Sequence, residues 1–374
     1  MNPRERALTA LEHREPDRVP LEGVAWGEWS YPFMLRLLAH LGIEGGRLTM
    51  AERQDALAER LGIDFRAVGV DPPASFREVA TYNQLFHYPW GIEVANDVLE
   101  DEWGVRRTLN ATRLQSRVIY HPLRGKTSLE GYVFPDAEAP GRFDAAERLL
   151  KNWRGKYAVS GIHGGDAYFC QGWYIRGFTE LLRDLYANPG FAEELFDGLQ
   201  SYFLPVSKRL AEMGIDVLCI ADDVAMQTGM IISPRLWRRF IKPRMKAVVE
   251  AVKSQGCHVL FHTDGDCEAI IPDLIEIGVD ALNPIQPECM DPARIKRLYG
   301  DKLTLSGTIS VQRTLPMGSL QDVEEEVKTR LKTCGRGGGL ILAPTNQALL
   351  DIKVENFLAV YETAQRWGRY PLVL

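Results

Sequence analysis

The chain has 374 residues, of which 45% are hydrophobic and 25% are charged, so it is long enough for one large domain or two smaller ones. Its 44 Lys and Arg residues against 50 Asp and Glu residues give a formal net charge of -6. This balance argues against a nucleic-acid-binding protein, because such proteins usually present a basic face. No apolar segment approaches the roughly 20 residues of a membrane helix, and the first residues carry both signs of charge without an apolar segment. Neither a membrane anchor nor a signal peptide is therefore expected. The 6 cysteines include no CxxC pair, which is typical of a reduced, cytoplasmic protein.

The first 140 residues give mixed signals and are expected to form an N-terminal extension together with the first elements of the main fold. Apolar residues at helical spacing predict helices over residues 1–14 and 50–61. Residues 65–135 are short strand-like segments interrupted by Pro and Gly. Ring side chains that could line the lid of a pocket cluster in this region, namely Trp26, Trp29, Phe86, His87, Tyr88 and Trp90. Trp26, Trp29 and His87 among them are the candidate substrate contacts. The alternative is that these side chains simply pack, which is the common role of large rings.

From about residue 140 onward, short apolar strands alternate with helices. The expected strands are residues 157–162, 216–220, 258–261, 279–282, 303–305 and 340–342. The expected helices are residues 143–154, 178–187, 190–213, a long helix from Ser233 to Gly256, 268–277, 291–299, a helix that begins at Ser319, and 354–367. The regular alternation of a short strand with a helix predicts a parallel sheet. Continuously apolar strands predict that this sheet is covered on both faces. We therefore expect residues 1–374 to form a single (β/α)8 barrel, and not an open doubly wound sheet with a GxGxxG motif after its first strand.

In such a barrel, the residues that follow the strands share one face, and active sites lie on that face. The polar residues at these positions are His163, Asp166, Asp222, Asp223, His262, Asp264, Asp266, Asn283, Gln286, Ser306, Thr308, Thr345 and Asn346. Polar loops are common, but this density of His, Asp and Asn favours an active site over a purely structural edge.

His262-Thr263-Asp264 is the most specific of these motifs. Side chains two residues apart at the end of a strand point to the same side, so His262 and Asp264 can bind one divalent metal. Alternatively, Asp264 orients His262 as a general base, or Asp264 caps the helix at residue 268 while Gly265 forms the turn. The sequence leaves these three interpretations open. Cys267, close to this motif, is the one cysteine considered as a thiolate ligand.

The adjacent acids Asp222 and Asp223 follow a buried strand, and one of them is expected to face the mouth of the barrel. They can supply a proton, bind a metal or hold a cationic group. The structural alternative is a helix cap or an ion pair with Arg235 or Arg238. His163, which also follows a strand, is a candidate catalytic residue or a capping one.

Arg176 follows an aromatic segment that includes Tyr168, and both residues are candidate substrate contacts. The guanidinium of Arg176 would suit an anionic group of the substrate. Equally, it could bond the carbonyls of a loop, which is a structural role.

Several motifs of the chain resemble the uroporphyrinogen decarboxylase superfamily. The segments that carry the resemblance extend over nearly the whole chain and are Arg4-Glu5-Arg6, Pro16-Asp17-Arg18-Val19-Pro20, Asp101-Glu102-Trp103-Gly104, Arg176-Gly177-Phe178, Asp222-Asp223, Gln227, Ser233-Pro234, Lys242-Pro243, His262, Ile271-Pro272-Asp273-Leu274, residues 278–284, Gly307 and Glu355-Asn356. The resemblance implies a (β/α)8 barrel and one of two activities. The superfamily holds porphyrinogen decarboxylases, which need no cofactor, and zinc-dependent methyltransferases, which move methyl groups between small substrates, corrinoid proteins and thiols.

Two departures from the family patterns separate these activities. Decarboxylases of the superfamily carry an Arg-rich segment after the first strand, whereas residues 21–28 here contain no Arg and two Glu, which would repel the carboxylates of a porphyrinogen. The methyltransferases carry a His-x-Cys pair at the strand that matches His262 and a further Cys at the last strand. Asp264 and Pro344-Thr345-Asn346 stand at these two places. A His and Asp site is harder than a thiolate site and suits an oxygen substrate such as a methoxyl group.

The sequence therefore favours a cytoplasmic enzyme that demethylates a small methoxylated or methylated substrate, with a separate corrinoid protein as the methyl acceptor. We expect His262 and Asp264 to hold a divalent metal, with zinc as a candidate, or to polarise the leaving oxygen. Asp222 or Asp223 would supply a third ligand or the proton. A homodimer is a candidate assembly. The remaining predicted substrate contacts are Gln227, Asn283, Gln286, Glu288 and Asn346.

Two other functions stay open. One is a cofactor-independent decarboxylase of a small carboxylic acid or a porphyrinogen-like acid, with Arg176 binding the carboxylate and Asp222, Asp223 or His163 as the acid. The other is a non-catalytic binding barrel, against which the density of polar residues after the strands argues.

Overall fold

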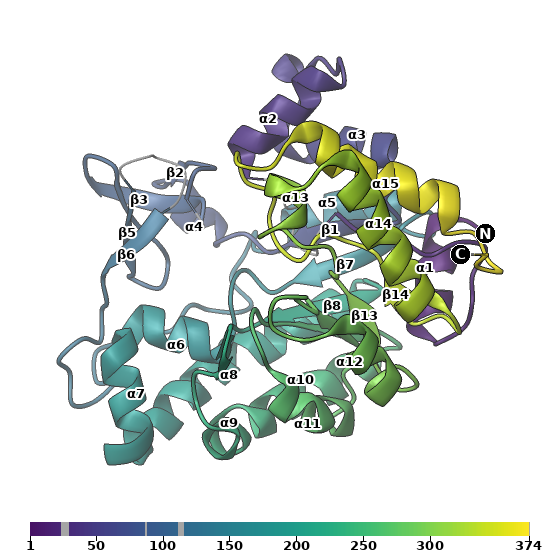
Figure 1. Cartoon of the computed structure of the whole chain (residues 1–374). Helices are drawn as coiled ribbons and strands as arrows, with labels where there is room; N and C mark the ends of the chain where they lie inside the picture. Colours follow the sequence, from purple (N-terminus) through teal and green to yellow (C-terminus); the bar gives the residue numbers. More distant parts are fainter. Residues whose placement is uncertain (24–29, 87, 111–115, 374) are drawn as a thin grey trace.

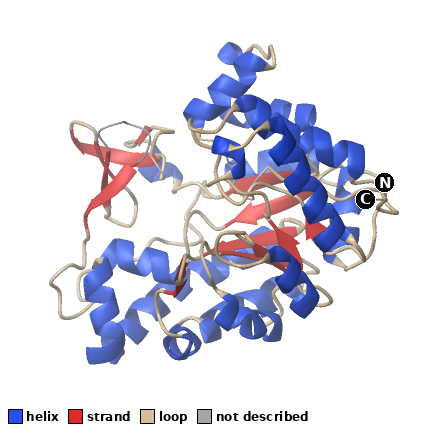
Figure 2. Ribbon diagram, viewed as in Figure 1, coloured by secondary structure: helices blue, strands red, loops and turns tan. Residues whose placement is uncertain are grey.

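The structure, a computed structural model, describes residues 1–23, 30–86, 88–110 and 116–373. Its centre is a curled sheet of seven parallel strands with helices packed around it (Figure 1; Figure 2). In sheet order the strands are β1 (Phe65–Gly69), β7 (Ala158–Ile162), β8 (Val217–Ala221), β11 (His258–His262), β12 (Ala281–Asn283), β13 (Thr304–Ser306) and β14 (Leu340–Ile341). Strands that are adjacent in this sheet also follow one another in the sequence, which confirms the predicted parallel α/β architecture.

The eighth position of the predicted barrel is only partly described. Leu21 forms a parallel bridge with Leu342 at the end of β14, and the N–H of Asp64, which precedes β1, donates to the Leu21 carbonyl at 2.8 Å. In the described residues this contact is a single bridge and not a strand, and residues 24–29 lie outside the described part. The curled parallel sheet is therefore confirmed, and its closure into a (β/α)8 barrel stays a prediction.

The parallel strands are apolar because both of their faces are covered. All five residues of β8 are buried, and β11 is buried from its second residue onward. Full burial of a Val, Leu or Ile side chain stabilises a fold by about 1.5–3 kcal/mol, so these strands specify the centre of the molecule.

The helices that follow the extension are α5 (Asp144–Trp153), α6 (Tyr168–Arg176), α7 (Phe178–Ala187), α8 (Pro189–Glu212), α9 (Pro234–Phe240), α10 (Lys242–Lys253), α11 (Ile271–Glu276), α12 (Pro292–Tyr299), α13 (Thr314–Met317), α14 (Leu320–Arg330) and α15 (Val354–Trp367). Most of them agree closely with the sequence pattern, but α6 and α13 were not predicted. Ser319 and Asp322 form the expected capping box at the start of α14. The long helix predicted after Ser233 is instead two helices, because Pro243 has no N–H to donate and α9 ends before it.

The N-terminal region forms helices and a separate antiparallel sheet. Its helices are α1 (Pro3–Leu11), α2 (Tyr31–His40), α3 (Met50–Leu61) and α4 (Ala74–Arg77). The antiparallel sheet contains β2 (Thr81–Tyr82), β3 (Trp90–Ala95), β4 (Val98–Glu100), β5 (Arg106–Leu109) and β6 (Ser116–Tyr120), and stands at the left in Figure 1. A two-stranded hairpin, β9 (Ala225–Met226) and β10 (Gly229–Met230), follows β8.

A buried ion pair connects the antiparallel sheet to the helical layer. The fully buried guanidinium of Arg142 donates to both carboxylate oxygens of Glu102, at 2.9 and 2.8 Å, and to the Tyr202 hydroxyl of α8 at 3.1 Å. Glu102 belongs to the turn between β4 and β5, so this contact fixes where the antiparallel sheet stands. Among the described residues, no helix is both long and apolar enough to cross a membrane.

Candidate active site

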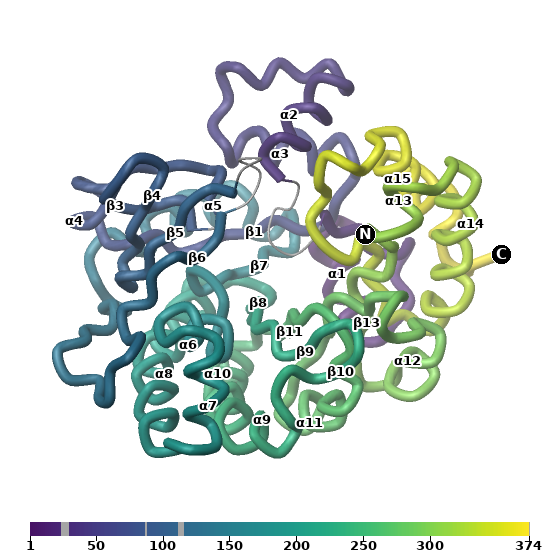
Figure 3. Tube along the Cα trace, turned by 60° about the vertical axis from the view of Figure 1, so that its left-hand side comes forward, coloured from purple at the N-terminus to yellow at the C-terminus, as the bar shows by residue number. Residues whose placement is uncertain are grey.

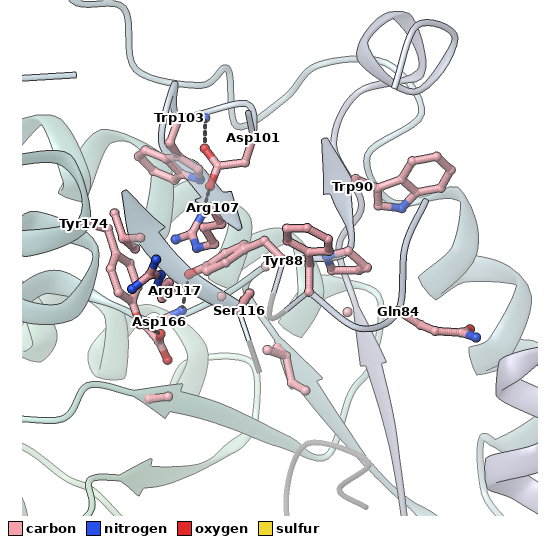
Figure 4. A pocket seen from close by; sticks show the side chains of 18 of the residues that line it. Gln84, Tyr88, Trp90, Asp101, Trp103, Arg107, Ser116, Arg117, Asp166 and Tyr174 are labelled. Atoms are coloured by element: carbon pink, nitrogen blue, oxygen red, sulfur yellow. Dashed lines mark hydrogen bonds and ion pairs between the residues drawn. The ribbon is translucent and has the colours of Figure 1, made fainter. Parts of the chain in front are cut away.

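A cavity of about 970 Å³ lies between the carboxyl ends of the parallel strands and the antiparallel sheet. Asp223, His262 and Asp264 line it from the parallel sheet, which curves around the centre of the molecule in Figure 3. Tyr88 and Arg107, which are labelled in the close view of Figure 4, line it from the region of the antiparallel sheet. A space of this size is typical of a site for a small molecule.

Strand register brings three ligating groups together at one end of this cavity. His262 is the last residue of β11 and lies beside Ala221 of β8 and Asn283 of β12. Asp223 follows β8 and Asp264 follows β11, so both carboxylates lie just beyond this row. One ligating atom each from Asp223, His262 and Asp264 lies within 4.8 Å of the other two. The predicted His262 and Asp264 pair is thus joined by Asp223.

Hydrogen bonds hold these three side chains in place. His262 Nδ1 lies 2.7 Å from Asn283 Oδ1, and His262 Nε2 lies 3.9 Å from Asp264 Oδ1. The Asp264 N–H donates to Asp223 Oδ1 at 2.8 Å, and the Asn346 amide donates to Asp264 Oδ2 at 2.7 Å. The imidazole therefore presents Nε2 to the two carboxylates, which is the arrangement that a metal-binding histidine requires.

The charge of this group also fits a divalent cation. Within the described part of the chain, neither Asp223 nor Asp264 forms an ion pair with a Lys or Arg side chain. Burial raises the pKa of Asp223 to about 6; the charge of His262 opposes this shift, whereas the charges of Asp264 and Asp166 add to it. Two close carboxylates and one imidazole nitrogen are donors that divalent metals accept, and a cation would supply the missing positive charge.

Asp222 is fully buried and does not line the cavity. Its carboxylate accepts the N–H groups of Phe169 and Cys170, at 3.0 and 2.9 Å, in the first turn of α6. Burial raises the pKa of Asp222 to about 8, and these two bonds oppose the shift. Asp222 thus anchors a helix, which is the capping alternative left open by the sequence, and Asp223 is the member of the pair that faces the cavity. Arg238, the alternative ion-pair partner, binds Asp273 instead.

Two further candidates, His163 and Tyr168, lie in the core. The His163 ring packs against Phe203 with 4.7 Å between ring centroids, and burial lowers its pKa to about 4. Tyr168 packs against the same Phe203 and donates its hydroxyl to Gln200. Both side chains are about 1% exposed and neither lines the cavity, so their predicted roles rest on the sequence alone.

Arg176 and Cys267 make contacts that are typical of structural residues. Arg176 Nε donates to Asp184 at 2.7 Å, and its Nη1 donates to the carbonyls of Leu123 and Lys126. This corresponds to the structural alternative for Arg176. Burial raises the pKa of the Cys267 thiol to about 12, and Cys267 does not belong to the group of ligating residues at the cavity.

The other predicted substrate contacts lie in and around the loops of the site. Asn346 lines the cavity, whereas Gln227 donates to Gln312 and Glu288 accepts from the Ser310 hydroxyl. Gln286 Oε1 accepts the Gly265 N–H at 3.2 Å and so supports the turn after Asp264. The Glu268 N–H, at the start of the helix at residue 268, donates to Asp266 Oδ1 at 3.1 Å, whereas the Asp264 side chain lines the cavity. Outside the described residues lie Trp26, Trp29 and His87.

The cavity is also lined by Arg107, to which the sequence analysis assigns no role. The Arg107 guanidinium lies 4.3 Å from the centroid of the Tyr88 ring and 4.9 Å from that of Tyr174. The Tyr174 hydroxyl donates to Asp166 Oδ2 at 2.7 Å, and Asp166 also lines the cavity (Figure 4). Asp166 follows β7 and is one of the strand-end residues that the sequence analysis selects. Arg107 lies on β5 of the antiparallel sheet, where no sequence pattern connects it to the cavity.

Comparison with known proteins relates the chain to a family and to two kinds of enzyme. The family described as uroporphyrinogen decarboxylase (URO-D) matches residues 115–367. A segment of 152 residues is 30% identical to the methylcobamide:CoM methyltransferase MtaA of Methanosarcina barkeri, over 41% of this chain and 42% of that protein. The uroporphyrinogen decarboxylase of Aliivibrio salmonicida is 22% identical over 247 residues, which are 63% of this chain and 67% of that one. The similarity to MtaA therefore extends over less than half of that protein's length.

Among solved structures, a methyltransferase from Methanosarcina mazei has the same fold. The TM-score is 0.71, and the alignment covers 98% of this chain and 99% of that chain at 18% sequence identity. Because the alignment covers nearly all of both chains, the N-terminal region is part of the shared fold as well.

Proposed function

Because the chain belongs to the uroporphyrinogen decarboxylase family, we propose that it is an enzyme that transfers a methyl group from a small methoxylated or methylated substrate to a separate corrinoid protein. The observation that carries this proposal is the group of Asp223, His262 and Asp264 at one end of a cavity large enough for a small molecule. The similarity to a methylcobamide-dependent methyltransferase supports the choice of a corrinoid partner. The proposal includes the closure of the curled sheet into a (β/α)8 barrel. It also places the enzyme in the cytoplasm.

We assign Asp223, His262 and Asp264 as the ligands of a divalent metal, with zinc as the first candidate. At this site Asp264 stands where the resemblance places a Cys, and Asp223 adds a second carboxylate. These harder donors favour an oxygen substrate over a thiol. When bound, the metal supplies Lewis-acid chemistry toward the oxygen that carries the methyl group.

The protein's own side chains would bind the substrate and move the proton. Tyr88, Trp90 and Tyr174 give the cavity an aromatic wall against which a flat substrate can pack. Loss of a methyl group leaves an oxygen that needs a proton. Asp166 lines the cavity without a ligand role and is held by the Tyr174 hydroxyl at 2.7 Å, so we assign it this proton transfer.

Metal binding by the purified protein tests the proposal. We expect one zinc ion per chain, measured by competition with a chromophoric chelator, and an affinity at least about 100-fold weaker in His262→Ala and Asp264→Asn. Asp266→Asn is the matched control, because Asp266 is a neighbouring acid that accepts the Glu268 N–H and does not belong to the ligand group. Its affinity should equal that of the wild type. Absence of zinc from an active wild-type enzyme would remove the metal from the proposal.

The reaction itself is tested with methoxylated compounds and a purified corrinoid protein. We expect methylation of the corrinoid, followed by its absorption spectrum, to depend on His262. Demethylation that proceeds at full rate without the corrinoid protein would contradict the assigned acceptor.

A second candidate function is the decarboxylation of a small carboxylic acid. It is favoured by Arg117, a cationic side chain that lines the cavity and could attract a carboxylate. Arg107 also lines the cavity but is paired with Asp101, and Arg176 lies elsewhere. Asp223 would then act as the acid, since its raised pKa of about 6 suits proton transfer near neutral pH. Release of carbon dioxide from candidate acids in the absence of any corrinoid protein would favour this function over methyl transfer.

A further inference from the structure

We propose that Glu22 is a positioning residue that acts through Ser306 and Asn283 to keep the proton of His262 on Nδ1, so that Nε2 stays available to a metal. This inference rests on the metal site proposed above and adds a residue outside the cavity to it. We call the four residues Glu22, Ser306, Asn283 and His262 the Glu22 relay.

Glu22 is a buried acid that needs an explanation. The residue is 2% exposed, and in the described part of the chain its carboxylate forms no ion pair with Lys or Arg. A buried carboxylate without an ion-pair partner lowers the stability of the fold by several kcal/mol. A functional role would explain why Glu22 is buried here. Its backbone is fixed, because its N–H donates to Leu342 at 3.0 Å and its carbonyl accepts the Tyr361 hydroxyl at 3.1 Å.

A continuous series of hydrogen bonds leads from this carboxylate to the metal-binding histidine. The Ser306 hydroxyl donates to Glu22 Oε2 at 2.9 Å, and Asn283 Nδ2 donates to Ser306 Oγ at 3.0 Å. Asn283 Oδ1 then lies 2.7 Å from His262 Nδ1. All four residues are at most 8% exposed, so water does not compete for these bonds.

The Glu22 carboxylate, at one end of the series, determines which group donates and which accepts in each hydrogen bond. An ionised carboxylate only accepts hydrogen bonds, so the Ser306 hydroxyl must donate to Glu22. The Ser306 oxygen then accepts from the amide nitrogen of Asn283, which turns the amide oxygen toward His262. The oxygen of an amide only accepts, so the proton of His262 must sit on Nδ1.

This orientation matters because a histidine nitrogen that carries a proton cannot bind a metal. If the Asn283 amide turned over, its NH2 group would face His262 Nδ1 and the proton would move to Nε2. The ring nitrogen that faces Asp223 and Asp264 would then be blocked. Glu22 prevents this reversal through one residue on each of two strands, Ser306 of β13 and Asn283 of β12.

Glu22→Gln tests the relay, because a glutamine amide can donate to Ser306 and so permits the reversed series. We expect zinc to bind about 10–100-fold more weakly, as is typical when the partner of a metal-binding histidine is lost. The second readout is the tautomer of His262 in metal-free protein, taken from 15N chemical shifts of labelled histidine. Zinc affinity and the His262 tautomer are both measured at pH 8. This is above the pKa of Glu22, which burial raises to about 7.

A double variant tests the mechanism more sharply. In Glu22→Gln with Asn283→Asp, the negative charge moves to the residue beside His262, and a carboxylate there accepts from Nδ1 in either orientation. We expect zinc affinity within about threefold of the wild type and the Nδ1–H tautomer restored. Glu326→Gln is the matched control, because Glu326 is a partly buried acid, 11% exposed, that is held by Arg330 and lies outside the relay. Should Glu22→Gln fail to fold, Ser306→Ala interrupts the same series.

The outcomes separate this inference from the proposed function. If the wild type binds zinc and Glu22→Gln binds it equally well with the Nδ1–H tautomer, the relay is overturned while the metal site stands. If the wild type binds no zinc, the metal site fails, and the tautomer in metal-free protein still decides the relay. A weaker zinc affinity that the double variant does not restore would assign Glu22 a purely structural role and overturn the proposal.

Discussion

At the scale of single residues, His163 illustrates what burial does to a titratable side chain. Its Nδ1 atom is buried without a hydrogen-bond partner among the described residues, and the ring packs against Phe203. Burial lowers the pKa of His163 from 6.5 to about 4, so the folded protein holds this imidazole neutral. Between these two pH values the unfolded chain binds a proton that the folded chain does not. The free energy of unfolding must therefore fall as the pH falls through this window.

We expect His163→Phe to remove this contribution. At about 1.4 kcal/mol per pH unit, the wild type should lose about 3 kcal/mol more than the variant between pH 6.5 and 4, measured by urea unfolding at each pH. His40→Phe is the control, because His40 is exposed on α2. This variant should show the same pH dependence of the free energy of unfolding as the wild type. Equal pH dependence in the wild type and in His163→Phe would contradict the assignment. Methyl transfer by the same variant tests the catalytic role that the sequence suggests for His163.

At the scale of elements, the turn after β11 determines where Asp264 stands. Gly265 has a φ of +89°, which side chains rarely adopt, and a Cβ at this position would lie 2.5 Å from the Met226 carbonyl oxygen. Gly256, at the end of α10, has a similar φ of +79° but nothing within 4 Å of its Cβ position.

Alanine at these two glycines separates backbone strain from steric contact. We expect Gly256→Ala to lower the free energy of unfolding by about 1 kcal/mol, which is the cost of the left-handed conformation. Gly265→Ala should cost about 2–4 kcal/mol, because the Met226 backbone must move as well, and should also weaken zinc binding. Urea unfolding and chelator competition measure the two effects. Equal losses in both variants would show that the β9–β10 hairpin yields freely to the added methyl group.

The same elements show what could be predicted from the sequence. Short apolar strands, each followed by polar residues, predict the parallel sheet and bring His262 and Asp264 to one end of it, because strand ends are local signals. Local patterns do not tell which of Asp222 and Asp223 faces the cavity, because this depends on how the chain leaves β8. The α6 helix is missed because it is buried on nearly all sides and has no polar face. Glu22 and Ser306 are 284 residues apart, and only the folded sheet brings them together.

At the scale of the whole molecule, one buried carboxylate connects the N-terminal residues to the first strand. Asp64 is fully buried and forms ion pairs with Arg6 at 2.6 Å and with Arg18 at 2.8 Å, and it also accepts the Leu21 N–H at 2.8 Å. These contacts hold the segment that carries Leu21 and Glu22 in the gap between β14 and β1. The N-terminal motif that resembles the family therefore has a structural role in holding this segment against β1.

We expect Asp64→Asn to lower the free energy of unfolding by about 3–5 kcal/mol, because it leaves two guanidinium groups without their buried partner. Asp17→Asn is the matched control, since Asp17 also binds Arg6 but is 42% exposed, and its loss should cost at most about 1 kcal/mol. Urea unfolding midpoints at equal m-values compare the two variants. If the segment at Leu21 is what closes the sheet and positions Glu22, Asp64→Asn should also bind zinc more weakly under conditions in which it is still folded, whereas Asp17→Asn should bind it as the wild type does. A folded Asp64→Asn protein with wild-type zinc affinity would mean that the metal site is built by the strands of the sheet alone.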